Sequence, residues 1–141
     1  MTVVAAVVAR LEDVGAVTSL VSDRIQATHL DEDSAMPAVL VQLIGRVKGQ
    51  HLRGPDNIAD FRVQVDSVAS TKSAADQLAA AVEGDGLGTL ASGLMGWKGH
   101  IGSPPVYIDS VKPAGEREHY DPPPTRQYRV QLDYIVSFRG F

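Results

Sequence analysis

Histidine is the side chain in this sequence best suited to bind a metal or to exchange a proton near neutral pH. A helix presents two histidines to one metal at a spacing of about three or four residues, and a strand at about two. None of the four histidines has such a partner, and each falls in a predicted connection: they are His29, His51, His100 and His119. Carboxylates flank His29 and His119, as is common in polar loops. The sequence therefore predicts no metal site and no cofactor.

Other motifs that could bind a ligand or catalyse a reaction lie in sequence surroundings that do not fit such a site. Asp31, Glu32 and Asp33 form an acidic run, but adjacent carboxylates do not converge on a cation without a dedicated loop such as the EF-hand's. The glycine-rich residues 84–88 follow a predicted helix, whereas a phosphate-binding loop follows a strand and opens a helix. The sequence has no Gly-x-Ser-x-Gly elbow. We therefore expect a protein that is not an enzyme.

Length and composition are typical of one globular domain. The chain has 141 residues, of which 44% are hydrophobic and 21% charged, so we expect residues 1–141 to fold as a single domain. Cysteine is absent, which excludes disulfides, and the formal charge of −4 gives no basic footprint for nucleic acid. The apolar start is cut short by Arg10 and Glu12, which predicts a helix of a soluble, cytoplasmically made protein rather than a membrane segment.

Hydrophobic periodicity predicts helices at the amino terminus and in the middle of the chain. The apolar side chains of residues 3–14 share one arc of a helical wheel. Helical spacing resumes after Gly15 and continues to Ile25, which predicts two helical pieces bent at that glycine. Residues 71–83 carry a stripe of alanines, which predicts a helix that lies close to a sheet and is ended by Gly84.

Alternation of apolar and polar residues predicts the strands. It is found in residues 38–47, 61–66, 106–111 and 128–138. Residues 112–125, which contain three consecutive prolines, are interpreted as a polar turn. The order of elements predicts an α+β fold, in which an antiparallel sheet of about four strands is packed by an N-terminal helix and a central helix.

Two segments each have two interpretations. Residues 45–57 are predicted to form a long hairpin with a projecting tip, which is either a solvated loop, the favoured interpretation, or a contact arm. Its charges are mostly basic, from Arg46, Lys48 and Arg53, with His51 beside them. Residues 87–94 keep the spacing of a short helix, and Trp97 follows them. This tryptophan, the only one, is interpreted equally as a plug over the core edge and as an interface anchor.

The order of these motifs resembles that of the tail-completion, or tail-terminator, proteins of long-tailed phages, a family also found in prophages and gene-transfer particles. The resemblance covers nearly the whole chain and departs from the family's pattern mainly between Gly84 and Pro105, which is longer and richer in glycine. It is carried by the order and spacing of residues 17–25, 37–42, 62–66, 74–82, 120–121 and 128–134.

This resemblance implies a structural neck protein of the virion, assembled in the host cytoplasm. Such proteins form a ring, typically of six copies, that caps the head-proximal end of the tail tube and stops its polymerisation. The ring also joins the tail to the head connector or stopper protein, and DNA passes through it without specific binding. The family has no catalytic residues to carry over to this sequence.

A ring needs subunit contacts and a channel that does not retain DNA. Six copies would carry −24, which is six times −4, and acidic walls would repel phosphates. Candidate contacts to another subunit or to the tube are Arg46, Lys48, His51, Arg53, Trp97, His100 and Tyr120. Candidate channel-facing carboxylates are Asp31, Glu32, Asp33, Glu116 and Glu118. Two alternatives stay open: another neck component, such as a stopper or head-completion protein, and a small ligand-binding α+β domain with a site near His100 or His119.

Overall fold

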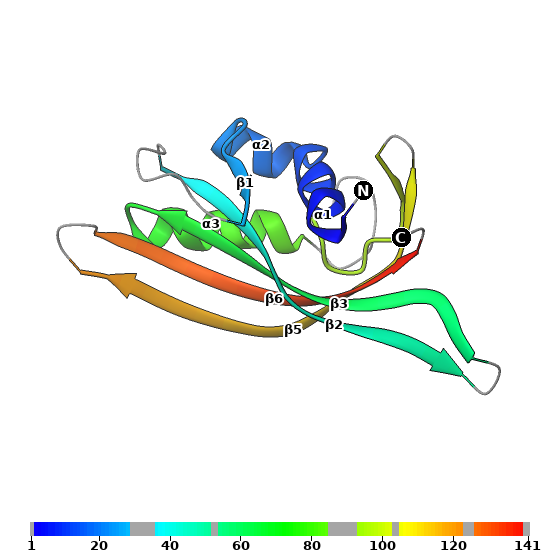
Figure 1. The fold of residues 1–141 in the computed structure, drawn as a ribbon. Coiled ribbons are helices and arrows are strands. Elements are labelled where there is room, and N and C mark those ends of the chain that lie inside the picture. Colours follow the sequence, from blue (N-terminus) through cyan, green and yellow to red (C-terminus); the bar gives the residue numbers. More distant parts are fainter. Residues whose placement is uncertain are drawn as a thin grey trace.

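A six-stranded sheet with its helices on one face organises the chain (Figure 1). The computed structural model describes residues 2–28, 36–51, 54–84, 93–102, 105–122 and 126–139, with main chain only at 47–51, 54–58 and 138–139. The helices are α1 (Val3–Glu12), α2 (Gly15–Val21) and α3 (Lys72–Glu83). The strands are β1 (Ile25–Ala27), β2 (Ala38–His51), β3 (Gly54–Ala69), β4 (Gly99–Ile101), β5 (Val106–Asp121) and β6 (Gln127–Arg139).

The sheet has the order β1-β2-β3-β6-β5-β4 and is mixed. The short edge strand β1 runs parallel to β2, and every other neighbouring pair is antiparallel. The predicted α+β class is correct, but the prediction of about four antiparallel strands missed both edge strands. Ile25, predicted at the end of a helix, instead begins β1 and pairs with Val39. An edge strand of three residues carries too little alternation to be recognised in the sequence.

The helices form where the periodicity predicts them and are capped by side chains. Thr2 and Thr71 each accept a hydrogen bond from a main-chain amide in the first turn, at 3.1 and 3.2 Å. The chain breaks between α1 and α2 next to Gly15, as predicted. The helix α3 ends at Gly84, whose φ of 77° is accessible to glycine at little cost.

Two long hairpins extend toward opposite ends of the molecule (Figure 1). One joins β2 to β3, as predicted for residues 45–57. The other joins β5 to β6 and pairs them as far as Asp121 with Gln127. The prediction of a polar turn over residues 112–125 is therefore wrong for 112–121, which continue β5. Alternation is lost there because the register of β5 shifts twice, between Ile108 and Ser110 and between Pro113 and Gly115.

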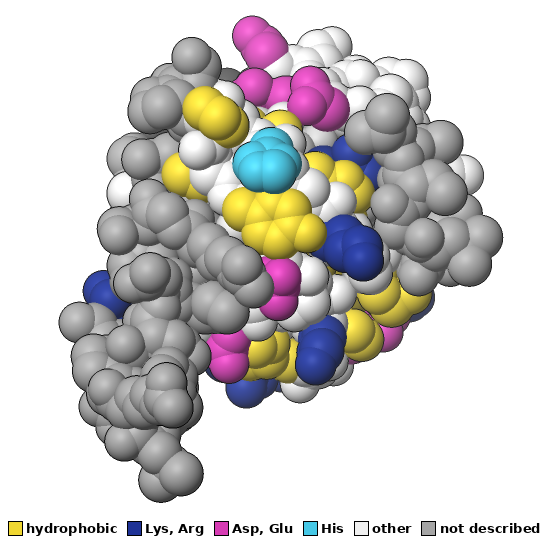
Figure 2. All heavy atoms as spheres, turned by 90° about the vertical axis from the view of Figure 1, so that its right-hand side faces the viewer, with side chains coloured by type: hydrophobic (Ala, Val, Ile, Leu, Met, Phe, Trp, Pro, Cys, Tyr) yellow, Lys and Arg dark blue, Asp and Glu magenta, His cyan; other side chains and the backbone are white. Residues whose placement is uncertain are grey.

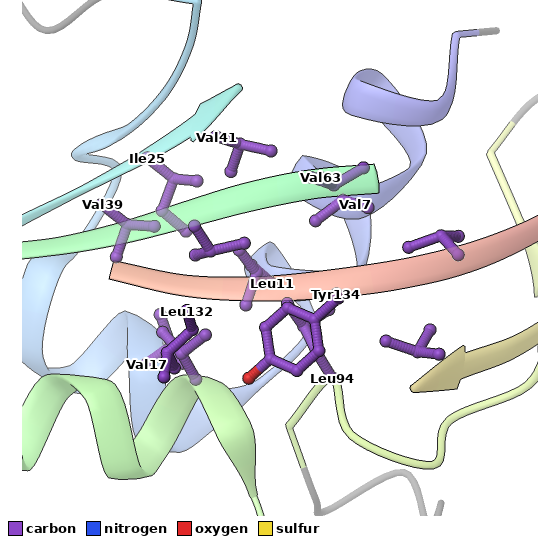
Figure 3. Close-up of a cluster of buried hydrophobic side chains, with 14 of the residues drawn as sticks. Val7, Leu11, Val17, Ile25, Val39, Val41, Val63, Leu94, Leu132 and Tyr134 are labelled. Atoms are coloured by element: carbon purple, nitrogen blue, oxygen red, sulfur yellow. The ribbon is translucent and has the colours of Figure 1, made fainter. Parts of the chain in front are cut away.

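The hydrophobic core lies between the helices and one face of the sheet (Figure 3). Val7 and Leu11 of α1 and Val17 of α2 meet Val63 of β3 and Tyr134 of β6 there. All of these side chains are buried. The helix α3 packs on β3 and β6, and alanines on its buried side permit a close approach.

A buried arginine ties the segment after α3 to the first helix. Arg10 is 1% exposed, its guanidinium lies 4.7 Å from the centre of the Trp97 ring, and its Nη2 donates to the Gly93 carbonyl at 3.2 Å. A side chain at Gly93 would collide with the main chain of Val82, so this position requires glycine. The indole of Trp97 is thus a core side chain, as in the first of its two interpretations.

Candidate interaction surfaces

The sheet face opposite the helices carries a network of charged and amide side chains. Because β3 and β6 alternate, Arg62, Gln64 and Asp66 of β3 point to this face together with the residues that pair with them on β6. Arg129 Nη1 donates to Asp66 Oδ2 at 2.9 Å, and Gln64 Nε2 donates to Asp66 Oδ1 at the same distance. The Asp66 side chain is only 1% exposed, although no described helix covers this face. It is buried by its neighbours on the sheet.

A second carboxylate extends the network to β5. Asp133 accepts a hydrogen bond from Arg62 Nη2 at 2.8 Å and forms an ion pair with Arg117 at 3.7 Å. Arg117 Nη2 also donates to Gln64 Oε1 at 3.2 Å, and this hydrogen bond joins the groups around Asp133 to the groups around Asp66. Four neighbouring strands are connected in this way, since Gln64 Nε2 also approaches Gln42 Oε1 at 3.4 Å. We call these residues the polar face.

Burial is the largest influence on the pKa of Asp66 in the polar face. It raises the pKa of the Asp66 carboxyl above its ordinary value, and the hydrogen bond from Gln64 and the charge of Arg129 oppose this rise. The face is therefore made largely of charges that pair with one another, although Arg129 Nε and Asp133 Oδ1 are buried there without a hydrogen-bond partner in the described structure. Such an arrangement has the character of a structural network rather than of a reactive centre, where a group is left available to a substrate.

On the helix side, a groove runs between α3 and the β5–β6 hairpin. Adjoining hollows of about 220, 290 and 240 Å³ share lining residues along it. We call it the acidic groove, because Asp76 and Glu83 of α3 and Glu116 and Glu118 of β5 line it above Val130 and Leu132 of β6. It arises because α3 packs on β3 and β6, so no described helix lies over the helix-side face of β5 beyond them.

The two histidines considered for a ligand site do not share one. His100 lies at the β4 edge, where its ring is 4.8 Å from that of Tyr107. His119 lies near the far end of β5 and is 2.8 Å from Asp121. Tyr107 and His119 are 12 residues apart on one strand, a separation of roughly 40 Å. Among the described residues no group of His, Cys, Asp and Glu is arranged to hold a metal ion.

The remaining predicted contact residues are scattered. Arg46 is exposed on β2 and lies over the Phe61 ring at 5.5 Å, and Tyr120 is 45% exposed and stacks on Tyr128 at 4.6 Å. Lys48 and His51 lie in β2, but only their main chain is described, and Arg53 lies outside the described residues. Trp97 is buried within the single chain, and its interface interpretation stays a prediction.

Only two of the predicted channel-facing carboxylates can be located. Glu116 and Glu118 are exposed and line the acidic groove. Asp31, Glu32 and Asp33 lie outside the described residues, as do residues 87–92 of the predicted short helix. At the end of the molecule that carries the β2–β3 hairpin, acidic, basic and hydrophobic side chains are interspersed in the described part of the surface (Figure 2). No large patch of one charge is visible there.

Sequence reasoning missed the polar face. Its signal was present, because Arg62, Gln64 and Asp66 alternate with buried valines, as do Arg129 and Asp133 on the last strand. These positions were interpreted only as the solvent side of their strands. Which arginine meets which carboxylate depends on the register between β3 and β6, where Asp66 lies opposite Gln131.

The fold and its surfaces define a class: an α+β protein with two projecting hairpins and, in the described part, a polar face of paired charges. No described helix is both long and apolar enough to cross a membrane. A family model described as "Tail completion protein gp17" matches residues 5–84, more than half of the chain. The chain belongs to this tail-completion family of phage structural proteins.

A solved structure has the same fold. The chain is similar to a protein in the "virion of native gene transfer agent (GTA) particle", with a TM-score of 0.60 and 16% sequence identity. The similarity covers 98% of this chain and 95% of the other. No curated protein matched in sequence. The resemblance seen in the sequence is thereby confirmed at the level of the family, and it indicates a component of a virion.

Proposed function

We propose that this protein caps the head-proximal end of a phage tail tube as a ring, ends tube polymerisation and joins the tail to the head connector. The observation that carries the proposal is the match to the tail-completion family over residues 5–84. The likeness to a virion component over nearly the whole chain supports it. A cap acts through contacts with its neighbours, which agrees with the projecting hairpins.

A ring of identical subunits uses head-to-tail contacts, so each subunit must carry two different complementary surfaces. The two hairpins extend to opposite ends of the molecule, as such contacts require (Figure 1). Six copies, the number expected from the resemblance, would carry six times −4, or −24. This net negative charge disfavours the retention of DNA during its passage.

The test is to inactivate the gene in the particle that encodes it. We expect full heads and separate tails, with tube lengths that exceed the normal length, because nothing ends polymerisation. Supplying the wild-type protein in trans should restore joined particles. Joined particles of normal tail length in the absence of the protein would refute the proposal. If the protein purifies on isolated heads and is absent from isolated tails, it is instead a stopper or head-completion protein.

A further inference from the structure

The acidic groove has an excess of negative charge that the described part of the chain does not balance. Lys72 forms ion pairs with Asp76 at 3.0 Å and with Glu118 at 3.6 Å, and it is the lysine that lines the groove at the α3 amino end. Glu83 and Glu116 form no salt bridge with any described residue. Carboxylates above an apolar floor attract a cationic segment more strongly than carboxylates on an open surface.

A buried hydroxyl lies at the same place. Tyr134 is 1% exposed and lines the groove together with Glu83 and Glu116. Its hydroxyl has no hydrogen-bond partner in the described structure, and burial with those two carboxylates raises its pKa well above the ordinary value. The hydroxyl is therefore a proton donor that lacks an acceptor, and buried donors are normally paired.

The chain itself contains a segment of complementary charge. Residues 45–57 include Arg46, Lys48 and Arg53 and one acidic residue, Asp56, so residues 45–55 are basic. Of these, residues 45–51 and 54–55 lie in the outer part of the β2–β3 hairpin, where β3 has no described β6 partner before Ile58. The hairpin projects from one end of the sheet, whereas the β5–β6 hairpin that borders the groove extends to the other (Figure 1). One copy cannot bring these two surfaces together, but neighbouring copies in a ring can.

We propose that the basic tip of the β2–β3 hairpin of one copy docks in the acidic groove of the next, and that this contact closes the ring. The proposal rests on the ring function above and names its subunit interface. It also assigns Glu116 and Glu118 to that interface rather than to the channel wall. Pairing along the outer edge of β5 is a poor alternative, because the Val111 carbonyl already accepts from the Gly96 amide and Pro113 lacks an amide donor. The register of the strand is also shifted on both sides of Pro113.

Charge exchange tests this contact. Variant A carries Glu83→Lys and Glu116→Lys, and variant B carries Arg46→Glu and Lys48→Glu. Oligomerisation is measured by analytical ultracentrifugation, with the chain alone and with the tube protein of the same particle. We expect each variant to associate at least about 100-fold more weakly than wild type, because like charges then face each other. A one-to-one mixture of A and B should regain assembly, since each groove again meets a hairpin of opposite charge.

The controls distinguish loss of the docking contact from two other causes of weak assembly, which are unfolding and altered net charge. A variant with Glu12→Lys and Asp23→Lys, both exposed and away from the groove, changes the net charge as A does and should assemble normally. Circular dichroism melting checks that A and B are folded, and if A is unfolded, Glu116→Lys alone replaces it. Rings formed by A or B as readily as by wild type, or no recovery in the mixture, would overturn the docking proposal while leaving the ring intact. A wild-type chain that forms no ring even with the tube protein would overturn both.

Discussion

Removing the Arg129 guanidinium is the most informative perturbation of the polar face. Arg129→Met keeps the aliphatic part of the side chain and leaves the Asp66 carboxylate, 1% exposed, with its hydrogen bond from Gln64. Loss of one partner of a buried ion pair costs about 3–5 kcal/mol in unfolding free energy. Because Gln64 still donates at 2.9 Å and Arg129 is itself 22% exposed, we expect the lower end, about 3 kcal/mol.

The opposite change should cost less. Asp66→Asn leaves the Arg129 guanidinium without its carboxylate, but this side chain is 22% exposed and water can reach it. We expect a loss of about 1–2 kcal/mol in unfolding free energy. The double variant should lose less than the sum of the two single losses, because each single variant leaves one charge without its partner and the double variant leaves none.

The contribution of Asp66 to the unfolding free energy changes with pH in a direction that its pKa shift fixes. The pKa of Asp66 is raised in the folded protein, so the folded state holds this proton more readily than the unfolded state. The resulting stabilisation is full below the unfolded pKa and is lost as the pH rises through the folded pKa. Without Arg129 the folded pKa rises further. The cost of Arg129→Met should therefore shrink as the pH falls from about 7 to about 5.

Urea unfolding followed by circular dichroism at both pH values measures these quantities. Comparing variants with wild type at each pH removes acid effects that all chains share. Lys72→Met is the matched control, because it removes a solvent-exposed cation and should change stability little at either pH. A loss below about 1 kcal/mol for Arg129→Met at neutral pH, or an equal loss at both pH values, would refute the buried-charge account.

Three further substitutions test other parts of the structure by the same unfolding assay. Gly93→Ala places a Cβ against the Val82 carbonyl and should cost about 1–3 kcal/mol or more; an unchanged stability would contradict the close approach. Thr71→Ala removes the cap of α3, which accepts from the Ala74 amide, and should cost about 1 kcal/mol; no loss would mean that the cap is dispensable. Tyr134→Phe removes an unpaired buried hydroxyl and should be neutral or stabilise by up to about 1 kcal/mol; a clear loss would reveal a partner for that hydroxyl.

The sequence predicts the long helices and strands of this fold better than it predicts the short edge strands and the full length of β5. Alternation and helical periodicity are local, so β2, β3, β6 and α3 were recognised. The edge strands β1 and β4 have three residues each, too few for a periodic signal. The extension of β5 was missed because two register shifts and the polar residues of the acidic groove disturb its alternation.

The surfaces depend on contacts between distant parts of the chain. Asp66 and Arg129 are separated by 63 residues and meet only once β3 pairs with β6. The acidic groove likewise requires α3 to lie beside β5, which no local pattern specifies. The basic character of residues 45–55 was visible in the sequence, whereas the groove that complements it in charge became visible only in the fold.

We have proposed that this protein caps the head-proximal end of the tail tube as a closed ring. Electron cryomicroscopy of the head–tail junction of the particle would show whether it does. We expect a single ring between the tube and the connector into which this α+β fold fits, with the β2–β3 hairpin of each copy on the next. Finding the protein in the capsid shell or at the distal tip of the tail, with no copy at the junction, would contradict the claim.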